Sequence, residues 1–260
     1  MKILLTNDDG INAPGLYALY KEIKKLGDVI VVAPDSERSA VGHAITLSAP
    51  LRVSEFKRNG EFFGYAVNGM PADCVKIAYW AILNEEKPDL VISGINLGSN
   101  TGINIIYSGT VSASTEGSML GIPSFAISLT TFVNPDFRFA AKFARKISPI
   151  LIERELPPGI SLNINVPALK EEEIRGVIIT RQGKALYREE FDKRIDPHNR
   201  LYYWLAGSKV EIEEDEDVDD RAIMNNKISI TPIHYDLTKY DTMNELKQWN
   251  LNQILNSNER

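Results

Sequence analysis

Short apolar runs alternate with amphipathic segments along the first 130 residues of this 260-residue chain. Residues 2–6 (KILLT) form an apolar run that is typical of a strand buried on both faces of a sheet. Residues 16–26 then repeat apolar positions at helical spacing, and residues 28–34 (DVIVVAP) form a second apolar run that ends at a proline. A strand, a helix and a strand within 35 residues predict the repeating unit of a parallel sheet with right-handed crossovers.

The same alternation continues to residue 166, with one interruption. Residues 45–53 and 62–67 predict two strands of an inserted, antiparallel piece. Residues 110–120 are rich in Ser, Ala and Gly, which favours a helix packed closely against its neighbours. We therefore expect a doubly wound α/β fold, in which a mostly parallel sheet lies between two layers of helices. The remaining expected elements are strands at 89–93, 124–128, 161–166 and 229–233 and helices at 72–83 and 136–153.

The character of the sequence changes after about residue 175. Charged and aromatic residues alternate at 185–204, and residues 241–255 suit a terminal amphipathic helix. Residues 211–220 (EIEEDEDVDD) hold eight carboxylates in ten positions. We interpret this stretch as a solvated loop or hairpin edge because like charges repel, with metal loading or partner binding as the alternative. The expected organisation is a catalytic core at 1–175 and a C-terminal extension at 176–260 that carries a hairpin-like arm.

Composition and charge narrow the class of protein. The 29 Lys and Arg residues against 35 Asp and Glu leave a net charge of −6, which argues against a nucleic-acid polymer but not against a small anionic substrate. The single cysteine, Cys74, excludes an internal disulfide and a multi-cysteine metal centre. No apolar run approaches the roughly 20 residues that a membrane span needs. We therefore expect a cytoplasmic protein that binds no membrane.

Polar, glycine-containing segments follow the predicted strands. They lie at 6–10 (TNDDG), 33–39 (APDSERS) and 93–100 (SGINLGSN). Because ligands of parallel α/β sheets bind at the carboxyl ends of the strands, these segments predict one shared site. Asp8 and Asp9 are adjacent, and two such carboxylates disfavour each other's charge unless a cation lies between them. The alternative is an ordinary Asp-Gly turn with two exposed acids.

Two further oxygen donors could complete a metal site beside the aspartates. Ser39 follows the second strand and Asn96 follows the third. Hydroxyl, amide and carboxylate oxygens together suit a hard divalent cation such as Mg²⁺, Mn²⁺ or Ca²⁺. Taken singly, Ser39 could be a helix cap and Asn96 a left-handed turn residue. Their convergence on one edge of the sheet is what predicts a metal site.

A helix start completes the predicted site. Ser108, Gly109 and Thr110 can cap a helix and present backbone N–H groups to an anion, although a plain N-cap is an alternative. His43 could donate a proton or a hydrogen bond to a phosphate or a leaving oxygen, with a structural loop histidine as the alternative. Opposite a metal, the helix start would form a phosphate-binding site.

Absent motifs narrow the chemistry further. The chain has no G-x-x-x-x-G-K-[ST] phosphate loop, no G-x-G-x-x-G after its first strand and no G-x-S-x-G nucleophile elbow. The two acids at the end of the first strand are adjacent, not separated by one residue as in aspartyl-phosphate enzymes. This arrangement favours direct attack by a metal-activated water over a covalent carboxylate intermediate.

Eight short motifs, in this order along the chain, resemble the survival protein SurE family. They occupy residues 6–10, 33–39, 69–75 (GMPADCV), 93–96, 108–110, 163–167 (NINVP), 180–182 (TRQ) and 229–232 (SITP). Each motif is modest alone, but eight in order from residue 1 to about residue 235 are highly specific.

The resemblance implies a metal-dependent 5′-nucleotidase with a Rossmann-like core and a protruding C-terminal part that is exchanged between subunits. It implies one divalent cation per subunit, Mg²⁺ or Mn²⁺, held by Asp8, Asp9, Ser39 and Asn96. Some relatives also cleave 3′-nucleotides or short polyphosphate. The implied partners are a nucleotide substrate and further copies of the chain, as a dimer or tetramer.

Our leading hypothesis is therefore hydrolysis of a nucleotide phosphomonoester. Asp8 or Asp9 would steer or deprotonate the attacking water, and Asn96 with residues 108–110 would hold the phosphate oxygens. His43 is added as a further substrate-binding residue. Two alternatives remain: a nucleotide sensor without turnover, and a metal-dependent hydrolase of an amide or ester bond.

Overall fold

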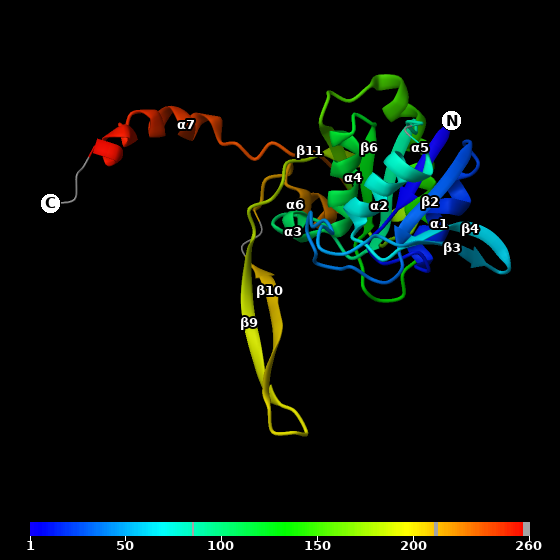
Figure 1. Ribbon diagram of the computed structural model, residues 1–260, viewed down its shortest axis with the longest axis horizontal. Helices are drawn as coiled ribbons and strands as arrows, with labels where there is room; N and C mark the ends of the chain where they lie inside the picture. Colours follow the sequence, from blue (N-terminus) through cyan, green and yellow to red (C-terminus); the bar gives the residue numbers. More distant parts are fainter. Residues whose placement is uncertain (85, 211–212, 257–260) are drawn as a thin grey trace.

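The computed structural model describes residues 1–84, 86–210 and 213–256 (Figure 1). A nine-stranded sheet forms its body, in the spatial order β3-β4-β2-β1-β5-β6-β7-β11-β8. These strands are β1 (Lys2–Thr6), β2 (Asp28–Pro34), β3 (Val53–Arg58), β4 (Glu61–Val67), β5 (Leu90–Leu97), β6 (Ser124–Leu129), β7 (Ile160–Val166), β8 (Val177–Ile179) and β11 (Ile228–His234). The helices are α1 (Pro14–Ile23), α2 (Pro71–Ile77), α3 (Asn104–Tyr107), α4 (Gly109–Met119), α5 (Arg138–Arg154), α6 (Asp219–Met224) and α7 (Tyr240–Lys247).

The strands formed by the apolar runs have no polar face because both of their faces are buried, as strand β1 illustrates. Alternate side chains of β1 point to opposite faces, and each face has its own core. Ile3 and Leu5 enter the core shared with α1 and α5, whereas Leu4 enters the core shared with α2 and α4. The neighbours of β1 are β2 and β5, and both run parallel to it. The expected doubly wound, mostly parallel α/β fold with three layers is confirmed.

The segment rich in Ser, Ala and Gly forms helix α4. Its residues from Gly109 to Ser118 are all buried, and the hydroxyls of Ser112, Ser114, Thr115 and Ser118 donate hydrogen bonds to backbone carbonyls within the same helix. A Cβ atom at Gly117 would lie 2.3 Å from the hydroxyl of Ser124, so the helix approaches β6 more closely than a side chain permits. The expectation of a closely packed helix is confirmed.

The inserted piece differs from expectation in its first strand. The strand predicted at 45–53 is wrong, because β3 begins only at Val53. In the preceding segment the Thr46 N–H donates to Asp73 and the Arg52 N–H donates to Asn68, so side chains satisfy backbone groups that a strand would pair. Strand β3 is antiparallel to β4, as expected, while β4 runs parallel to β2 and so extends the main sheet.

The division expected at residue 175 does not coincide with the edge of the sheet. Both β8 and β11 come later in the chain, yet they complete the nine-stranded sheet. Strands β9 (Leu186–Ile195) and β10 (Leu201–Val210) form a separate antiparallel hairpin, which we call the arm, and the arm projects clear of the sheet (Figure 1). Helix α7 ends at Lys247, and Asn250, with a φ of +51°, separates it from a short 3₁₀ turn.

The acidic stretch divides into two parts. Residues 211 and 212 lie outside the described residues. Glu213, Asp215 and Asp217 pair with the guanidinium of Arg181 near the surface, as suits a solvated loop. The last two acids, Asp219 and Asp220, are instead buried at the start of α6, so the interpretation as a fully solvated segment is wrong for them. Their hydrogen bonds, described below, compensate their burial.

No helix among the described residues has both the length and the apolar character that crossing a bilayer requires.

Candidate functional site

The candidate site lies where the strand order reverses. Chain order runs from β1 to β2 on one side and continues through β5 on the other, and ligand sites of doubly wound sheets occur at such a switch point. Asp8 and Asp9 follow β1 directly. Asn96 lies on β5 itself, because β5 extends four residues beyond the predicted end at residue 93. The two strands are in register at Thr6 and Ser93, which brings their carboxyl ends together.

Asp8 is held at the N-terminus of α4. Its carboxyl is buried and accepts a hydrogen bond from the hydroxyl of Thr110. A Cβ atom at residue 109 would lie 2.8 Å from the Cβ of Asp8, so Gly109 is what allows the helix to approach. The Ser108 hydroxyl caps the helix by accepting from the Val111 N–H at 3.1 Å. The structure thus brings Asp8 and residues 108–110 into one cluster.

The two aspartates share an environment that favours their neutral forms. Burial raises the pKa of Asp8, although its hydrogen bonds with Thr110 oppose the rise. Burial, followed by the charges of Asp8 and Glu37, raises the pKa of Asp9 to about 7. A positive charge beside the pair would reverse both effects.

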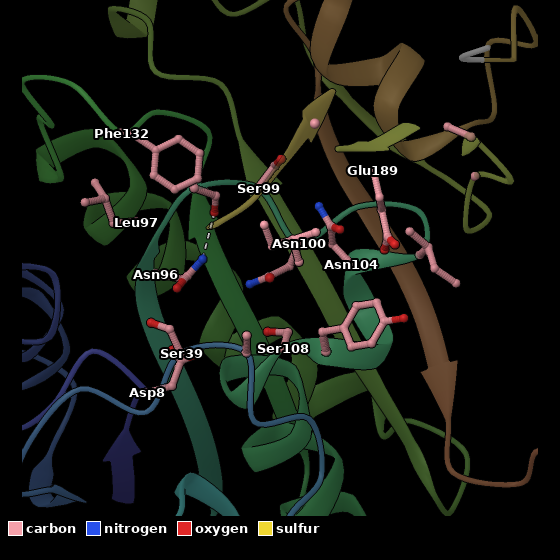
Figure 2. Close-up of a pocket in the computed structure, with 18 of the residues that line it drawn as sticks. Asp8, Ser39, Asn96, Leu97, Ser99, Asn100, Asn104, Ser108, Phe132 and Glu189 are labelled. Atoms are coloured by element: carbon pink, nitrogen blue, oxygen red, sulfur yellow. Dashed lines mark hydrogen bonds between the residues drawn. The ribbon is translucent and has the colours of Figure 1, made fainter. Parts of the chain in front are cut away.

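The oxygen donors around Asp8 suit such a charge. The amide nitrogen of Asn96 donates to the Gly98 carbonyl at 2.8 Å, which leaves its oxygen turned toward Ser39 and Asp8 (Figure 2). The Ser39 hydroxyl donates to Glu37 at 2.6 Å and keeps its own oxygen as an acceptor. Among the residues that the structure describes, no three His, Cys, Asp or Glu side chains cluster as a metal site. A cation here would therefore depend on hydroxyl and amide oxygens as well, as Mg²⁺ and Mn²⁺ sites allow.

A cavity of about 1220 Å³ opens beside Asp8 and extends to the arm. Asp8, Ser39, Asn96 and Ser108 lie together at one end of it (Figure 2). The sequence analysis missed most of the remaining lining, because it considered only strand ends and polar motifs. The missed lining residues include Asn104, Tyr107, Phe132, Lys184, Glu189 and Leu205, with Gln182 present only as part of a motif.

His43 lies in a different group from the cavity-lining residues. Its Nε2 is 3.0 Å from the carboxylate of Glu116, a buried residue of α4, and the ammonium of Lys76 is 2.6 Å from the other oxygen of that carboxylate. This ion cluster fastens the loop that carries His43 to α4 and α2. The structure therefore does not bring His43 to the cavity lining with Asp8.

A buried hydrogen-bond network fixes the loop that follows β5. Asn100 lies at its centre: the Asn100 N–H donates to Asn165 at 2.8 Å, its amide donates to Ser128 at 2.9 Å, and its carbonyl accepts from Asn163 at 2.7 Å. Asn163 and Asn165 are two residues apart on β7 and so point to the same face. Their alternation with Leu162, Ile164 and Val166 is the sequence pattern that indicates this shared face.

Asp219 and Asp220 fasten the same loop to the root of the arm. Asp219 accepts from the N–H groups of Gly102 and Gly183, at 2.8 and 3.0 Å. Asp220 accepts from the Thr101 hydroxyl at 2.6 Å and from the ammonium of Lys209 at 2.7 Å. The position of the arm is thereby coupled to the loop that forms the floor of the cavity.

Fold and site together define a doubly wound α/β protein with an acidic, oxygen-lined site beside a helix N-terminus. The family described as "Survival protein SurE" matches residues 3–189, and the chain belongs to this family. The expected resemblance is confirmed.

Relatives match over nearly the whole chain. A protein of Syntrophus aciditrophicus (strain SB) named "5′-nucleotidase SurE" is 56% identical over 248 residues, which cover 95% of this chain and 93% of the relative. One of the same name from Syntrophobacter fumaroxidans is 51% identical and covers 96% of this chain and 100% of the relative. The crystal structure of the SurE protein from Aquifex aeolicus superposes with a TM-score of 0.84 at 44% identity, covering 96% and 99% of the two chains.

Proposed function

We propose that this protein is a divalent-metal-dependent phosphohydrolase that converts nucleoside 5′-monophosphates to nucleoside and phosphate. The observation that carries the proposal is the placement of the buried Asp8, beside Asp9, against the N-terminus of α4 and next to Asn96. The printed name of the relatives, 5′-nucleotidase, supports the same reaction class.

We assign the cation-holding role to Asp8, Asp9, Ser39 and Asn96. A bound Mg²⁺ or Mn²⁺ would supply positive charge that stabilises the negative charge on a phosphate oxygen and favours ionisation of an attacking water. The raised pKa values of both aspartates support this assignment, because such a pair ionises readily only beside a cation. Asp9 is the proposed proton acceptor, as the carboxylate next to Asp8 in the cation-holding set.

We assign the phosphate to the start of α4. The helix N-terminus offers the positive end of the helix dipole, which stabilises a phosphate oxygen as its charge grows. Gly109 leaves room for close approach, and Ser108 lines the cavity at this point. Thr110 acts through Asp8, to which its hydroxyl is bound. His43 is a weaker candidate, because its ring pairs with Glu116.

The proposed step is a direct displacement at phosphorus. Water supplies the oxygen of the new P–O bond, its proton passes to Asp9, and the bond to the ribose 5′ oxygen breaks. The leaving oxygen takes up a proton from solvent and departs as the nucleoside hydroxyl, and Asp9 returns its proton to solvent. The cavity is large enough for this substrate and extends well beyond Asp8, so 3′-nucleotides and short polyphosphate are included in the proposed substrate range.

We further propose that the protein is a homo-oligomer. The arm exposes more than half the surface of Phe191, Tyr203, Trp204 and Leu205, and the C-terminal segment exposes Trp249. Apolar side chains grouped in this way on a projecting hairpin favour contact with another copy of the chain (Figure 1). A monomeric mass by light scattering at micromolar concentration would refute this part of the proposal.

Phosphate release from a panel of 5′- and 3′-mononucleotides, with Mg²⁺, Mn²⁺ or EDTA, tests the function. The proposal expects release with metal and none with EDTA, and the ranking of the panel defines the substrate range. Nucleotide binding without release under every condition would instead indicate the sensor alternative. Release from amide or ester substrates alone would place the chemistry outside phosphate transfer.

A further inference from the structure

Phe132 is an exposed aromatic residue on the lining of the cavity. Its side chain is 76% exposed, although burial of an aromatic ring is favourable. Figure 2 shows it beside Leu97, on the side of Asn96 that lies away from Asp8. This large apolar ring is left open on the lining of the cavity that holds Asp8 and Asn96.

The backbone is arranged to hold this ring in place. The tip of the ring rests on Gly98, where a Cβ atom would lie 2.3 Å from Cζ and 2.5 Å from Cε1. Gly98 has a φ of +103°, and its N–H donates to the carbonyl of Leu129, which joins the ends of β5 and β6. The Thr131 hydroxyl donates to the carbonyl of Val133 and accepts from its N–H, which closes the turn that carries Phe132.

We infer that Phe132 is the platform on which the base of the nucleotide stacks, an inference that rests on the proposed nucleotidase function. Asn96 and Gly98 are two residues apart, which separates them by at most about 7 Å. One ribose spans the gap between a phosphate held near Asn96 and Asp8 and a base lying on Phe132. Stacking requires only a π face, so the platform accepts every base and favours the larger purines.

The matched test compares nucleotides with a substrate that lacks the base. For adenosine 5′-monophosphate, Phe132→Ala raises KM about tenfold and leaves kcat within about twofold, as loss of one base–aromatic stack predicts. For ribose 5-phosphate, the same variant leaves KM unchanged. Phe132→Trp retains the wild-type KM for the nucleotide. Val133→Ala is the control, because Val133 is 71% exposed in the same turn but does not line the cavity.

Three results would overturn the inference. One is a Phe132→Ala variant whose KM for adenosine 5′-monophosphate is unchanged. Another is an equal rise in KM for ribose 5-phosphate, which would place the effect on the phosphate end. The third is a rise in KM for adenosine 5′-monophosphate, but not for ribose 5-phosphate, in Tyr107→Ala and no such rise in Phe132→Ala. That result would place the base on Tyr107, the other exposed ring of the lining.

The inference and the proposed function fail separately. If the wild-type protein releases no phosphate from any nucleotide, the proposed reaction is refuted. The platform is then judged by calorimetric binding of adenosine 5′-monophosphate to the same variants. Weakened binding with Phe132→Ala but not with Val133→Ala supports it, and equal binding overturns it.

Discussion

The hydroxyl of Thr110 donates a hydrogen bond to Oδ1 of Asp8, across 102 positions of the sequence. This bond connects the first turn of α4 to the end of β1. It stabilises the ionised form of a carboxyl whose pKa is raised by burial. It also orients that carboxyl toward the proposed cation.

Replacing Thr110 with Val, which has nearly the same shape, tests this link. The buried carboxylate of Asp8 then loses a donor, so we expect the free energy of unfolding in the presence of EDTA to fall by about 1–3 kcal/mol. We also expect kcat for nucleotide hydrolysis to fall at least tenfold, because the carboxylate is no longer oriented. Urea denaturation and steady-state kinetics measure the two effects. The control is Thr110→Ser, which keeps the donor; a Val variant that matches the Ser variant in both would contradict the role.

Asp8→Asn and Asp9→Asn test the proposed metal site. Each removes a carboxylate that holds the cation, so kcat should fall by about a thousandfold with Mn²⁺ supplied, equivalent to about 4 kcal/mol of barrier. Calorimetric titration should show weakened Mn²⁺ binding. Ser36→Ala, in the same loop as Ser39 but bonded to Asp35, is the control that should change neither. An Asp8→Asn protein that is folded and nearly fully active would refute the assignment.

The pKa of Asp9 predicts how metal affinity depends on pH. Burial and the neighbouring acids raise this pKa to about 7, so below pH 7 a proton must leave before the carboxylate can hold a cation. We expect the Mn²⁺ affinity of the wild-type protein to be nearly constant above pH 7.5. It should fall by up to about tenfold between pH 7 and pH 6. Asp9→Asn should bind more weakly and with a smaller pH dependence over the same range.

The parts of this molecule that could be predicted from the sequence depend on local pattern. The strand β1 and the second half of β2 are apolar runs buried on both faces, so both strands could be predicted from hydrophobicity. Asp8 and Asn96 could be placed at one edge because parallel strands end on the same side. The end of β5 could not be predicted from the sequence. Asn96 and Leu97 continue the pairing with β6 through a register shift, and no local pattern indicates that shift.

The features that escaped prediction depend on contacts between distant segments. Asp219 and Asp220 belong to a run of acids whose composition favours solvent. Their burial is explained by donors from distant segments: the N–H groups of Gly102 and Gly183, the Thr101 hydroxyl and the ammonium of Lys209. Phe132 lies on the cavity lining against Gly98, just past the end of β5, where any side chain would clash with the ring. Neither relationship can be derived from the residues of one segment alone.

The ion pair between Lys209 and Asp220 should be important for stability. The two side chains are only 16% and 10% exposed. Lys209→Met leaves a buried carboxylate without its cation, so we expect a loss of about 3 kcal/mol in the free energy of unfolding. Lys209→Met combined with Asp220→Leu should lose less than Lys209→Met alone, because no buried charge is then left unpaired.

The control for this pair is Arg181, which is 37% exposed and whose partners Glu213, Asp215 and Asp217 are 27%, 71% and 59% exposed. Arg181→Met should change the free energy of unfolding by no more than about 1 kcal/mol. Urea denaturation at pH 7 measures all of these variants. If the Lys209 and Arg181 variants lose the same amount, burial does not set the strength of the Lys209 pair.

Glu116 predicts a separate dependence of stability on pH. Burial opposes its ionisation, but its hydrogen bonds and ion pairs with His43 and Lys76 outweigh burial and hold its pKa below the ordinary value of 4.5. A carboxyl whose pKa is lowered in the folded protein contributes stability above its unfolded pKa and loses that contribution as pH falls through the folded pKa. We therefore expect Glu116→Gln to be less stable than wild type by about 2 kcal/mol at pH 7.

The difference between the wild-type and Glu116→Gln proteins should shrink as pH falls below 4.5, and urea denaturation at pH 7, 5 and 3.5 would show it. Glu86→Gln is the control, because Glu86 pairs with Lys2 at the surface and its stability curve should overlay that of wild type. His43→Ala should reproduce part of the loss at pH 7, since it removes one of the two partners of Glu116. A stability difference for Glu116→Gln that is the same at all three pH values would show that packing, and not the charge of Glu116, holds the His43 loop against α4.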